Sequence, residues 1–326
     1  MRTILLACTA ALTAGAAFAQ DDREGWPESF TVATASQGGT YFAYGSGWAN
    51  LVAEELGLTG GAEVTGGPGQ NMALVHTGDA QFGMTTMGPA AEAIAGENPI
   101  APGLQMTNAC AMFPMYETPF SVTALSSSGI ESVSDIPAGA RIGFGPAGST
   151  SDTYFPQMMT DLGVDYERRN GGWDDLGSQL QDGLLDVIAF AAGVPVPAVS
   201  QLEVQTDVNI IEFTEEEQAK IIEDFPVAAY EIPADTYQSL DAPARSVSMW
   251  NFAIANCDLP DSFVNAVVDV VMSDNERMVG IHAAADTTVP ENWDKNSGTI
   301  KWHPGAAQWF IDNAGADIPA ENIHGS

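Results

Sequence analysis

Apolar residues along the chain recur with strand spacing and with helix spacing in turn. Residues 30–34 alternate between apolar and polar positions, and apolar residues then recur with helical spacing as far as Leu56. The same succession begins again at Arg141, where a short apolar run leads into a helical pattern over residues 150–162. Strands that alternate with helices in this way predict an α/β fold with mostly parallel sheets.

Glycine-rich turns stand between the strand and the helix in both stretches. The first covers residues 36–45 and the second residues 143–153. Such a turn leaves free backbone N–H groups at the helix start, where the helix dipole also favours negative charge. We therefore expect two lobes, each of which offers one helix start to a single small anionic ligand in the cleft between them. In open α/β sheets such ligands bind beyond the carboxyl ends of the strands.

The other expected elements set the domain boundaries. The chain crosses to the second lobe at residues 121–125 and returns near residue 246. Lobe 1 should comprise residues 20–121 and 246–326, lobe 2 residues 122–245, and the hinge two or three crossing strands. Further strands are expected at 62–65, 80–86, 109–125 (broken by Pro114 and Pro119), 186–193 and 246–255. Further helices are expected at 72–76, 92–95, 174–185, 194–199, 261–272 and 306–313.

The N-terminal residues have the pattern of a secretory signal. Met1-Arg2 is followed by an apolar run to Phe18 and by Ala17-Phe18-Ala19, a small-residue cleavage site. This pattern predicts a signal peptide over residues 1–19, cleavage after Ala19, and a periplasmic, soluble protein. A lipoprotein signal at Cys8 is the alternative, but that cysteine lies inside the apolar run. No later segment approaches the roughly 18 apolar residues of a membrane span, so direct membrane insertion is not expected.

The charge balance restricts the partners. The chain has 10 Lys and Arg against 43 Asp and Glu, a formal net charge of −33. Nucleic-acid binding is excluded because a phosphate backbone requires basic residues, and anionic membranes are disfavoured for the same reason. The acidity indicates a solvated surface, and adaptation to high external salt is a sharper hypothesis.

The mature chain has two cysteines, Cys110 and Cys257. Both lie in apolar, strand-like surroundings, which favours two buried free thiols. An oxidising compartment would also permit a bridge between them.

Enzyme chemistry has little support in the sequence. The four histidines are dispersed and show no metal-ligand spacing, and neither a G-x-S-x-G elbow nor a phosphate-binding G-x-x-x-x-G-K-[ST] loop is present. We therefore expect no catalysis, no cofactor and no metal site.

The candidate ligand contacts lie in and around the glycine-rich turns, where they could instead form tight turns, helix caps or core. Asn71 could reach the ligand or cap its own helix, and Phe190, Gly193 and Pro195 form either a wall of the site or a turn before a helix. The first-lobe candidates are Ser36, Gly39, Thr40, Tyr41, Asn71, Thr85 and Thr86. The second-lobe candidates are Gly148, Ser149, Thr150, Ser151, Phe190, Gly193 and Pro195.

Four neighbouring residues have weaker claims. Arg141 is expected in an interlobe or structural salt bridge, because it precedes the turn by several residues. Tyr44 and Tyr154 are expected to pack in the core. Trp173 is either an aromatic lid over the ligand or part of a surface loop.

The order of these motifs resembles the TAXI family of solute-binding proteins, which serve one branch of the tripartite ATP-independent periplasmic (TRAP) transporters. The resemblance covers essentially the whole mature chain. The chain departs from the family pattern at Pro68, Gly69 and Gln70 and at residues 85–87, next to the expected pocket. The motifs are Ser36–Phe42, Thr65–Asn71 with Gly78–Met84, Arg141–Thr150, Asp182–Phe190 with Gly193–Ala198, and His303–Ala306.

The resemblance implies a two-lobed periplasmic binding protein of type II-like fold. It implies a small carboxylate ligand, such as glutamate or another acidic amino acid, a dicarboxylate or a keto acid. It also implies delivery of that ligand to TRAP permease subunits in the membrane, with the binding protein acting as a monomer. The alternative function is a periplasmic sensor that passes its ligand state to a signalling partner.

Overall fold

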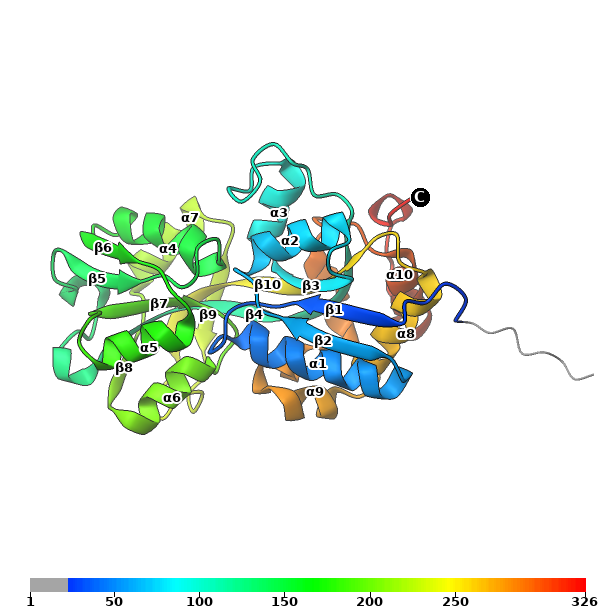
Figure 1. Ribbon diagram of the computed structural model, residues 1–326. Coiled ribbons are helices and arrows are strands. Elements are labelled where there is room, and N and C mark those ends of the chain that lie inside the picture. The colour runs from blue at the N-terminus through cyan, green and yellow to red at the C-terminus, as the bar shows by residue number, and fades with distance from the viewer. Residues whose placement is uncertain (1–22) are drawn as a thin grey trace, which may run out of the picture.

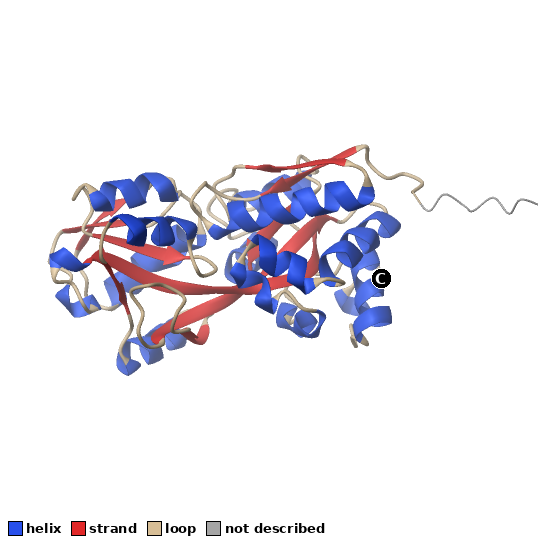
Figure 2. Ribbon diagram, turned by 90° about the horizontal axis from the view of Figure 1, so that it is seen from below, coloured by secondary structure: helices blue, strands red, loops and turns tan. Residues whose placement is uncertain are grey.

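The structure is a computed structural model that describes residues 23–326. The expected signal peptide and its cleavage site after Ala19 lie outside the described residues. Figure 1 shows two groups of strands and helices side by side along one long axis. Figure 2 shows long strands running from one group into the other, with helices on both faces of the sheet.

The first group is built on three parallel strands in the order β2-β1-β3. These strands are β1 (Ser29–Ala33), β2 (Thr59–Glu63) and β3 (Phe82–Thr86). The helices that belong to this group come from both ends of the chain (Figure 1). They are α1 (Thr40–Leu56), α2 (Pro68–Thr77), α3 (Met87–Ala95), α8 (Asp261–Met272), α9 (Asn275–Ile281) and α10 (Pro304–Ala314).

The second group repeats this plan with three parallel strands in the order β7-β5-β6. These strands are β5 (Ala140–Gly143), β6 (Tyr166–Arg169) and β7 (Val187–Ala191). The short strands β8 (Val208–Ile211) and β9 (Ala228–Ile232) are antiparallel to their neighbours. The helices of this group are α4 (Thr150–Asp161), α5 (Trp173–Gln181), α6 (Pro197–Gln205) and α7 (Glu215–Asp224).

Two long antiparallel strands join the groups. β4 (Ala109–Leu125) pairs with β10 over its first part and with β7 and β8 over its last part. β10 (Ala244–Asn256) pairs with β9 at its start and with β3 at its end. The prediction of mostly parallel strands therefore holds inside each group, and β4 and β10 make the whole sheet mixed.

The prediction that prolines break residues 109–125 is wrong, because β4 is one continuous strand of 17 residues. Pro114 pairs with Phe252 next to a register shift in β10, and Pro119 pairs with Ser248. A proline is tolerated in a strand at a bulge, or where its missing N–H would not have faced a partner acceptor.

The structure also contains elements that the hydrophobic pattern did not predict, namely β6, β8, β9, α7 and α9. Their sequences show why. β6 is Tyr-Glu-Arg-Arg and largely exposed, and α7 buries only Ile221 fully. An element with one buried residue leaves almost no periodic apolar signal.

The prediction of two free thiols is also wrong, because Cys110 and Cys257 form a disulfide with a Cα–Cα distance of 5.3 Å. Cys110 is paired with Ala255 at the start of β4, and Cys257 follows the last residue of β10. The antiparallel pairing of two strands 147 residues apart brings the thiols together. No local pattern around either cysteine carries that information.

None of the helices within residues 23–326 is long and apolar enough to cross a membrane.

Candidate ligand-binding site

Five helix N-termini meet at one cavity between the two groups. Each follows a parallel strand, in the pairs β1–α1, β2–α2, β3–α3, β5–α4 and β6–α5. The carboxyl ends of parallel strands share one edge of a sheet, which is where open α/β folds bind ligands. The cavity is lined by Ala35, Gly39, Thr40, Tyr41, Gly67, Pro68, Thr86, Thr118, Pro146, Ser149, Thr150, Trp173, Ala191 and Ala192.

The lining residues include the cap or first helical residue of all five helices. Gly39, Gly67 and Thr86 are the N-caps of α1, α2 and α3, and none of them makes a side-chain capping hydrogen bond. Ser149 caps α4 by accepting a hydrogen bond from the Asp152 N–H, and Trp173 is the first residue of α5. Several backbone N–H groups therefore remain free to bind an acceptor in the cavity.

The electrostatics of three of these helix starts favour an anion. The first turns of α1, α2 and α3 contain no acidic residue, although the chain is rich in them. By contrast, α7 begins with three glutamates, which offset its dipole. No lining residue carries a charged side chain. The first turns of α4 and α5 do contain acidic residues, namely Asp152 and the pair Asp174 and Asp175. The attraction for an anion therefore comes from the backbone dipoles of α1, α2 and α3 rather than from arginine or lysine.

Hydroxyl and amide groups form a network along the floor of the cavity. The Tyr41 hydroxyl donates to Asn251 Oδ1 at 2.6 Å, and Asn251 Nδ2 donates to Thr118 Oγ1 at 2.6 Å. Thr86 Oγ1 lies 3.2 Å from the Tyr41 oxygen and 2.8 Å from Thr150 Oγ1. Because the Thr118 oxygen accepts from the amide, its own proton is free to bind an anion. Burial raises the pKa of Tyr41, so its phenol stays protonated and remains a donor.

Trp173 forms an aromatic side of the cavity. It is 4% exposed and stacks on Phe190 with ring centroids 4.4 Å apart. Gly39 gives it room, since a Cβ there would lie 2.8 Å from Trp173 Cδ1. Gly145 does the same at φ +78°, with a Cβ position 2.4 Å from Trp173 Cζ2. These two glycines let both glycine-rich turns close on one tryptophan.

Direct contacts between the two groups show a closed cleft. Besides the Thr86–Thr150 contact, the Ala198 N–H donates to Gly38 O at 3.0 Å. The Tyr154 hydroxyl donates to Glu92 Oε1 at 2.7 Å, and burial is the main cause of the raised pKa of Glu92. The cavity has a volume of about 30 Å³, which is room for one or two water molecules. A larger ligand can enter only when the two groups separate.

The structure brings together Gly39, Thr40, Tyr41, Thr86, Ser149 and Thr150 of the sequence-predicted residues around the cavity. Ser36 lies next to this lining, and its buried hydroxyl has no hydrogen-bond partner within residues 23–326. Phe190 lies behind Trp173 as its stacking partner.

The other predicted residues lie outside the lining and make structural contacts. Gly148 N–H donates to Asp152, and Ser151 Oγ accepts from the Ala191 N–H at 2.6 Å. The Gly193 carbonyl accepts from the Thr40 hydroxyl. Thr85 precedes Thr86 in β3, and neighbouring residues of a strand point to opposite faces.

Two more predicted residues have clear places elsewhere. Asn71 is fully buried, and its Nδ2 donates to Thr34 O and Met84 O at 2.7 and 2.8 Å. It therefore ties together the ends of β1 and β3. Pro195 lines a separate cavity of about 360 Å³ that also includes Tyr116 and Glu117.

The structure also shows where the four residues with weaker claims lie. The structural salt bridge expected of Arg141 is confirmed, because its guanidinium pairs with Asp186 at 2.7 Å inside the second group. Tyr44 is fully buried and Tyr154 is 6% exposed, as expected for core residues. The surface-loop alternative for Trp173 is wrong, because the residue is buried against Phe190.

Sequence reasoning did not identify Thr118 or Asn251, which lie side by side in the two crossing strands. Asn251 is a single polar residue between apolar neighbours, and Thr118 follows Glu117 between two largely apolar runs, so the signal in the sequence is weak. A polar side chain inside a buried strand has to find a partner, and here the partners come from two strands and α1.

Solved structures show the fold to which this chain is similar. BugD, a periplasmic binding protein, superposes with a TM-score of 0.57 at 14% identity, over 89% of this chain and 99% of that chain. MatC from Rhodopseudomonas palustris, solved with bound malate, gives 0.58 at 15% identity, over 86% and 97%. A structure described as a periplasmic transporter gives 0.58 at 12% identity, over 86% and 96%. The fold is therefore that of the two-lobed periplasmic binding proteins.

The sequence itself places the chain more narrowly. The profile of the NMT1-like family matches residues 32–313, which is most of this chain. The protein belongs to the NMT1-like family.

Proposed function

We propose that this protein is the extracytoplasmic solute-binding component of a TAXI-type TRAP transporter and captures a small carboxylate between its lobes. The observation that carries the proposal is the convergence of five helix N-termini on one cavity without a charged lining residue. Such an arrangement favours a small anion and needs no basic side chain. The motifs from Ser36 to Phe42 and from Arg141 to Thr150 carry the TAXI assignment.

Relatives of the same fold support a carboxylate as the ligand. MatC was solved with malate, and a second Rhodopseudomonas palustris protein was solved with adipate, with a TM-score of 0.54 at 16% identity. Both ligands are dicarboxylates. The candidates for this chain are dicarboxylates, keto acids and acidic amino acids such as glutamate.

The mechanism is capture by closure. Of the described residues, lobe 1 comprises 23–121 and 246–326 and lobe 2 comprises 122–245, and the two boundaries fall inside β4 and β10. These strands act as the hinge, and the ligand favours the closed state because only that state offers helix starts from both lobes. The closed monomer then delivers the ligand in the periplasm to membrane permease subunits, with no catalytic step.

A thermal-shift screen of the mature protein tests this function. Amino acids, dicarboxylates, keto acids and sulfonates are compared in high-salt buffer, and one carboxylate class should raise the melting temperature because it binds only the folded state. A folded, ligand-free protein that responds to none of these anions would contradict the proposal.

Isosteric variants at the lobe contact give a sharper result. Thr86→Val and Thr150→Val keep the side-chain shape and remove a hydroxyl that faces the ligand, so each should weaken affinity about tenfold. Thr160→Val is the matched control, because its exposed hydroxyl caps a carbonyl at the far end of the same helix as Thr150. Calorimetric titration should show control affinity equal to that of the unmodified protein. Equal affinities in all four proteins would place the ligand elsewhere.

A further inference from the structure

We infer that the ligand is a carboxylate that carries no ammonium group, so that the site accepts oxo acids or dicarboxylates and rejects free amino acids. This inference rests on the proposed function and narrows its ligand class. It follows from what the cavity offers to each half of an amino acid. The carboxylate finds five helix N-termini, whereas the ammonium finds no anionic side chain in the lining.

The acidic residues near the cavity are already engaged. Asp152 accepts from the Gly148 N–H at 2.9 Å and forms an ion pair with Arg168. Glu92 accepts from the Tyr154 hydroxyl at 2.7 Å. A buried ammonium needs a carboxylate or several free acceptors to replace its water, and neither of these acids lies in the cavity lining.

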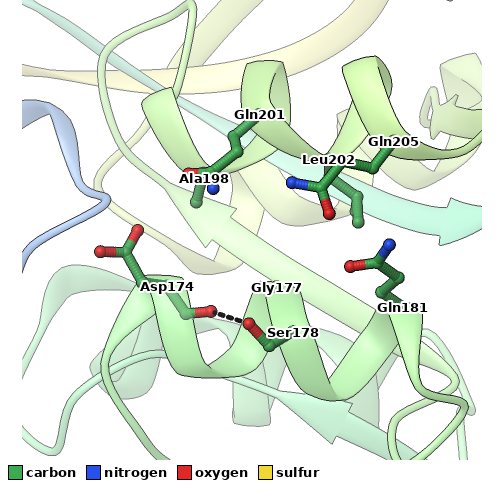
Figure 3. Close-up of a pocket in the computed structure, with 8 residues that line it drawn as sticks. All are labelled: Asp174, Gly177, Ser178, Gln181, Ala198, Gln201, Leu202 and Gln205. Carbon is green, nitrogen blue, oxygen red and sulfur yellow. Dashed lines mark hydrogen bonds between the residues drawn. The ribbon is translucent and has the colours of Figure 1, made fainter.

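Asp174 and Asp175, in the first turn of α5, are the other acidic residues close to the turns. Asp174 lines a groove of about 170 Å³ between α5 and α6, together with three glutamines. In Figure 3 its carboxylate lies at one end of that groove. Asp174 and Asp175 are both exposed and neither is part of the cavity lining, so water rather than the ligand solvates their carboxylates.

The backbone acceptors around the cavity are partly occupied. Each of four carbonyl oxygens beside the lining already receives one hydrogen bond and keeps one lone pair, and an uncharged carbonyl does not replace the carboxylate that a buried ammonium needs. The pairs are Gly39 N–H to Ser36 O, Ala198 N–H to Gly38 O, Ser149 N–H to Pro146 O and the Thr40 hydroxyl to Gly193 O.

The rest of the lining suits a carbon skeleton. Trp173 presents a ring stacked on Phe190, and Pro68 and Pro146 add further apolar surface. Ala191 and Ala192 close the end of β7 without any polar side-chain atom. A ligand with an apolar or oxo-substituted skeleton therefore leaves no polar group without a partner.

Matched pairs of ligands test the inference on the unmodified protein. The pairs are 2-oxoglutarate with L-glutamate, pyruvate with L-alanine, and 4-methyl-2-oxopentanoate with L-leucine, each titrated calorimetrically at pH 7. In the pair of the preferred size, the oxo acid should bind about a hundredfold more tightly. An amino acid that binds as tightly as its oxo acid, or more tightly, overturns this inference and leaves the proposed function standing. Failure of every carboxylate to bind overturns both.

A negative charge added to the cavity lining should reverse the preference for the oxo acid over the amino acid. Ala192→Asp supplies the missing partner for an ammonium, and Ala192→Asn is its neutral control of the same shape. The aspartate variant should bind the amino acid of the preferred pair more tightly than the oxo acid, and the asparagine variant should keep the original order. If both variants keep the original order while folding normally, the electrostatic basis is wrong.

The variant Asp174→Asn tests whether Asp174 could instead bind the ammonium group of an amino acid. The substitution removes the exposed carboxylate on α5 that borders the turn at Gly38. The ratio of affinities within each pair should not change. A large further loss of amino acid binding would show that Asp174 receives an ammonium and would overturn the inference.

Discussion

The hydroxyls of Thr86 and Thr150, 2.8 Å apart, form a polar contact between the two groups at the floor of the cavity. In the closed structure they bond to each other, whereas a bound carboxylate would accept from both. Closure therefore brings hydroxyl groups from both groups of elements to one place. The valine variants described above measure what these hydroxyls contribute.

His303 gives a prediction about pH. It caps α10 by accepting from the Gly305 N–H at Nδ1, and its Nε2 lies 3.1 Å from Leu259 O. Burial lowers the pKa of His303 from 6.5 to about 4. Because the folded-state pKa is lowered, the neutral form stabilises the fold above about pH 6.5, and this stability is lost as the pH falls toward 4. The loss amounts to about 3 kcal/mol in the free energy of unfolding.

Denaturant unfolding between pH 7 and pH 4 measures this loss. His303→Asn keeps a side chain that caps helices well but does not titrate, so its stability should fall less steeply over the same range. The comparison removes the contribution of the other titrating groups. Parallel pH profiles for the two proteins would show that His303 does not control acid stability.

At the scale of the elements, the bridge between Cys110 and Cys257 fastens the start of β4 to the end of β10. Replacing both cysteines with alanine frees a loop of 147 residues in the unfolded chain, which should lower the free energy of unfolding by about 2–5 kcal/mol. The bridge lies in the first group, at the opposite ends of these strands from their crossing into the second. Ligand affinity should therefore stay unchanged.

Chemical denaturation and calorimetry check both parts of this expectation. The unmodified protein in reducing buffer is the control and should lose a similar amount of stability. A double variant as stable as the oxidised protein would mean that the bridge adds nothing to the fold.

The elements also show how far the sequence predicts this molecule. Strand-turn-helix units with a clear apolar period, such as β1–α1 and β5–α4, were predicted together with their anion-binding turns. The edge strands β6 and β8 and the exposed helix α7 were missed, because few of their residues are buried. The spacing of apolar residues reflects which side chains are buried. An element with few buried side chains therefore leaves too weak a pattern to be predicted.

The residues of the candidate site also differ in how well the sequence predicts them. Residues inside a glycine-rich turn, such as Thr40 and Ser149, could be found from local sequence. Thr118, Trp173 and the bridge between the cysteines depend on contacts between segments far apart in the chain. Those contacts are set by strand pairing, which the sequence of either segment alone does not encode.

At the scale of the whole molecule, the net charge of −33 predicts a dependence on salt. Mutual repulsion of surface carboxylates destabilises the compact state, and salt screens it over distances beyond about 8 Å at 0.15 M. The melting temperature should therefore rise from low salt to molar sodium chloride. A melting temperature that stays constant or falls over this range would remove the hypothesis of adaptation to high salt.

The central claim is that five helix starts hold one carboxylate between two lobes. A crystal structure of the mature protein with the carboxylate that gives the largest thermal shift tests it most directly. We predict carboxylate oxygens within hydrogen-bonding distance of backbone N–H groups at the starts of α1 and α4, with the chain of the ligand against Trp173. A ligand bound in the cavity beside Pro195, or in the groove between α5 and α6, would contradict the account.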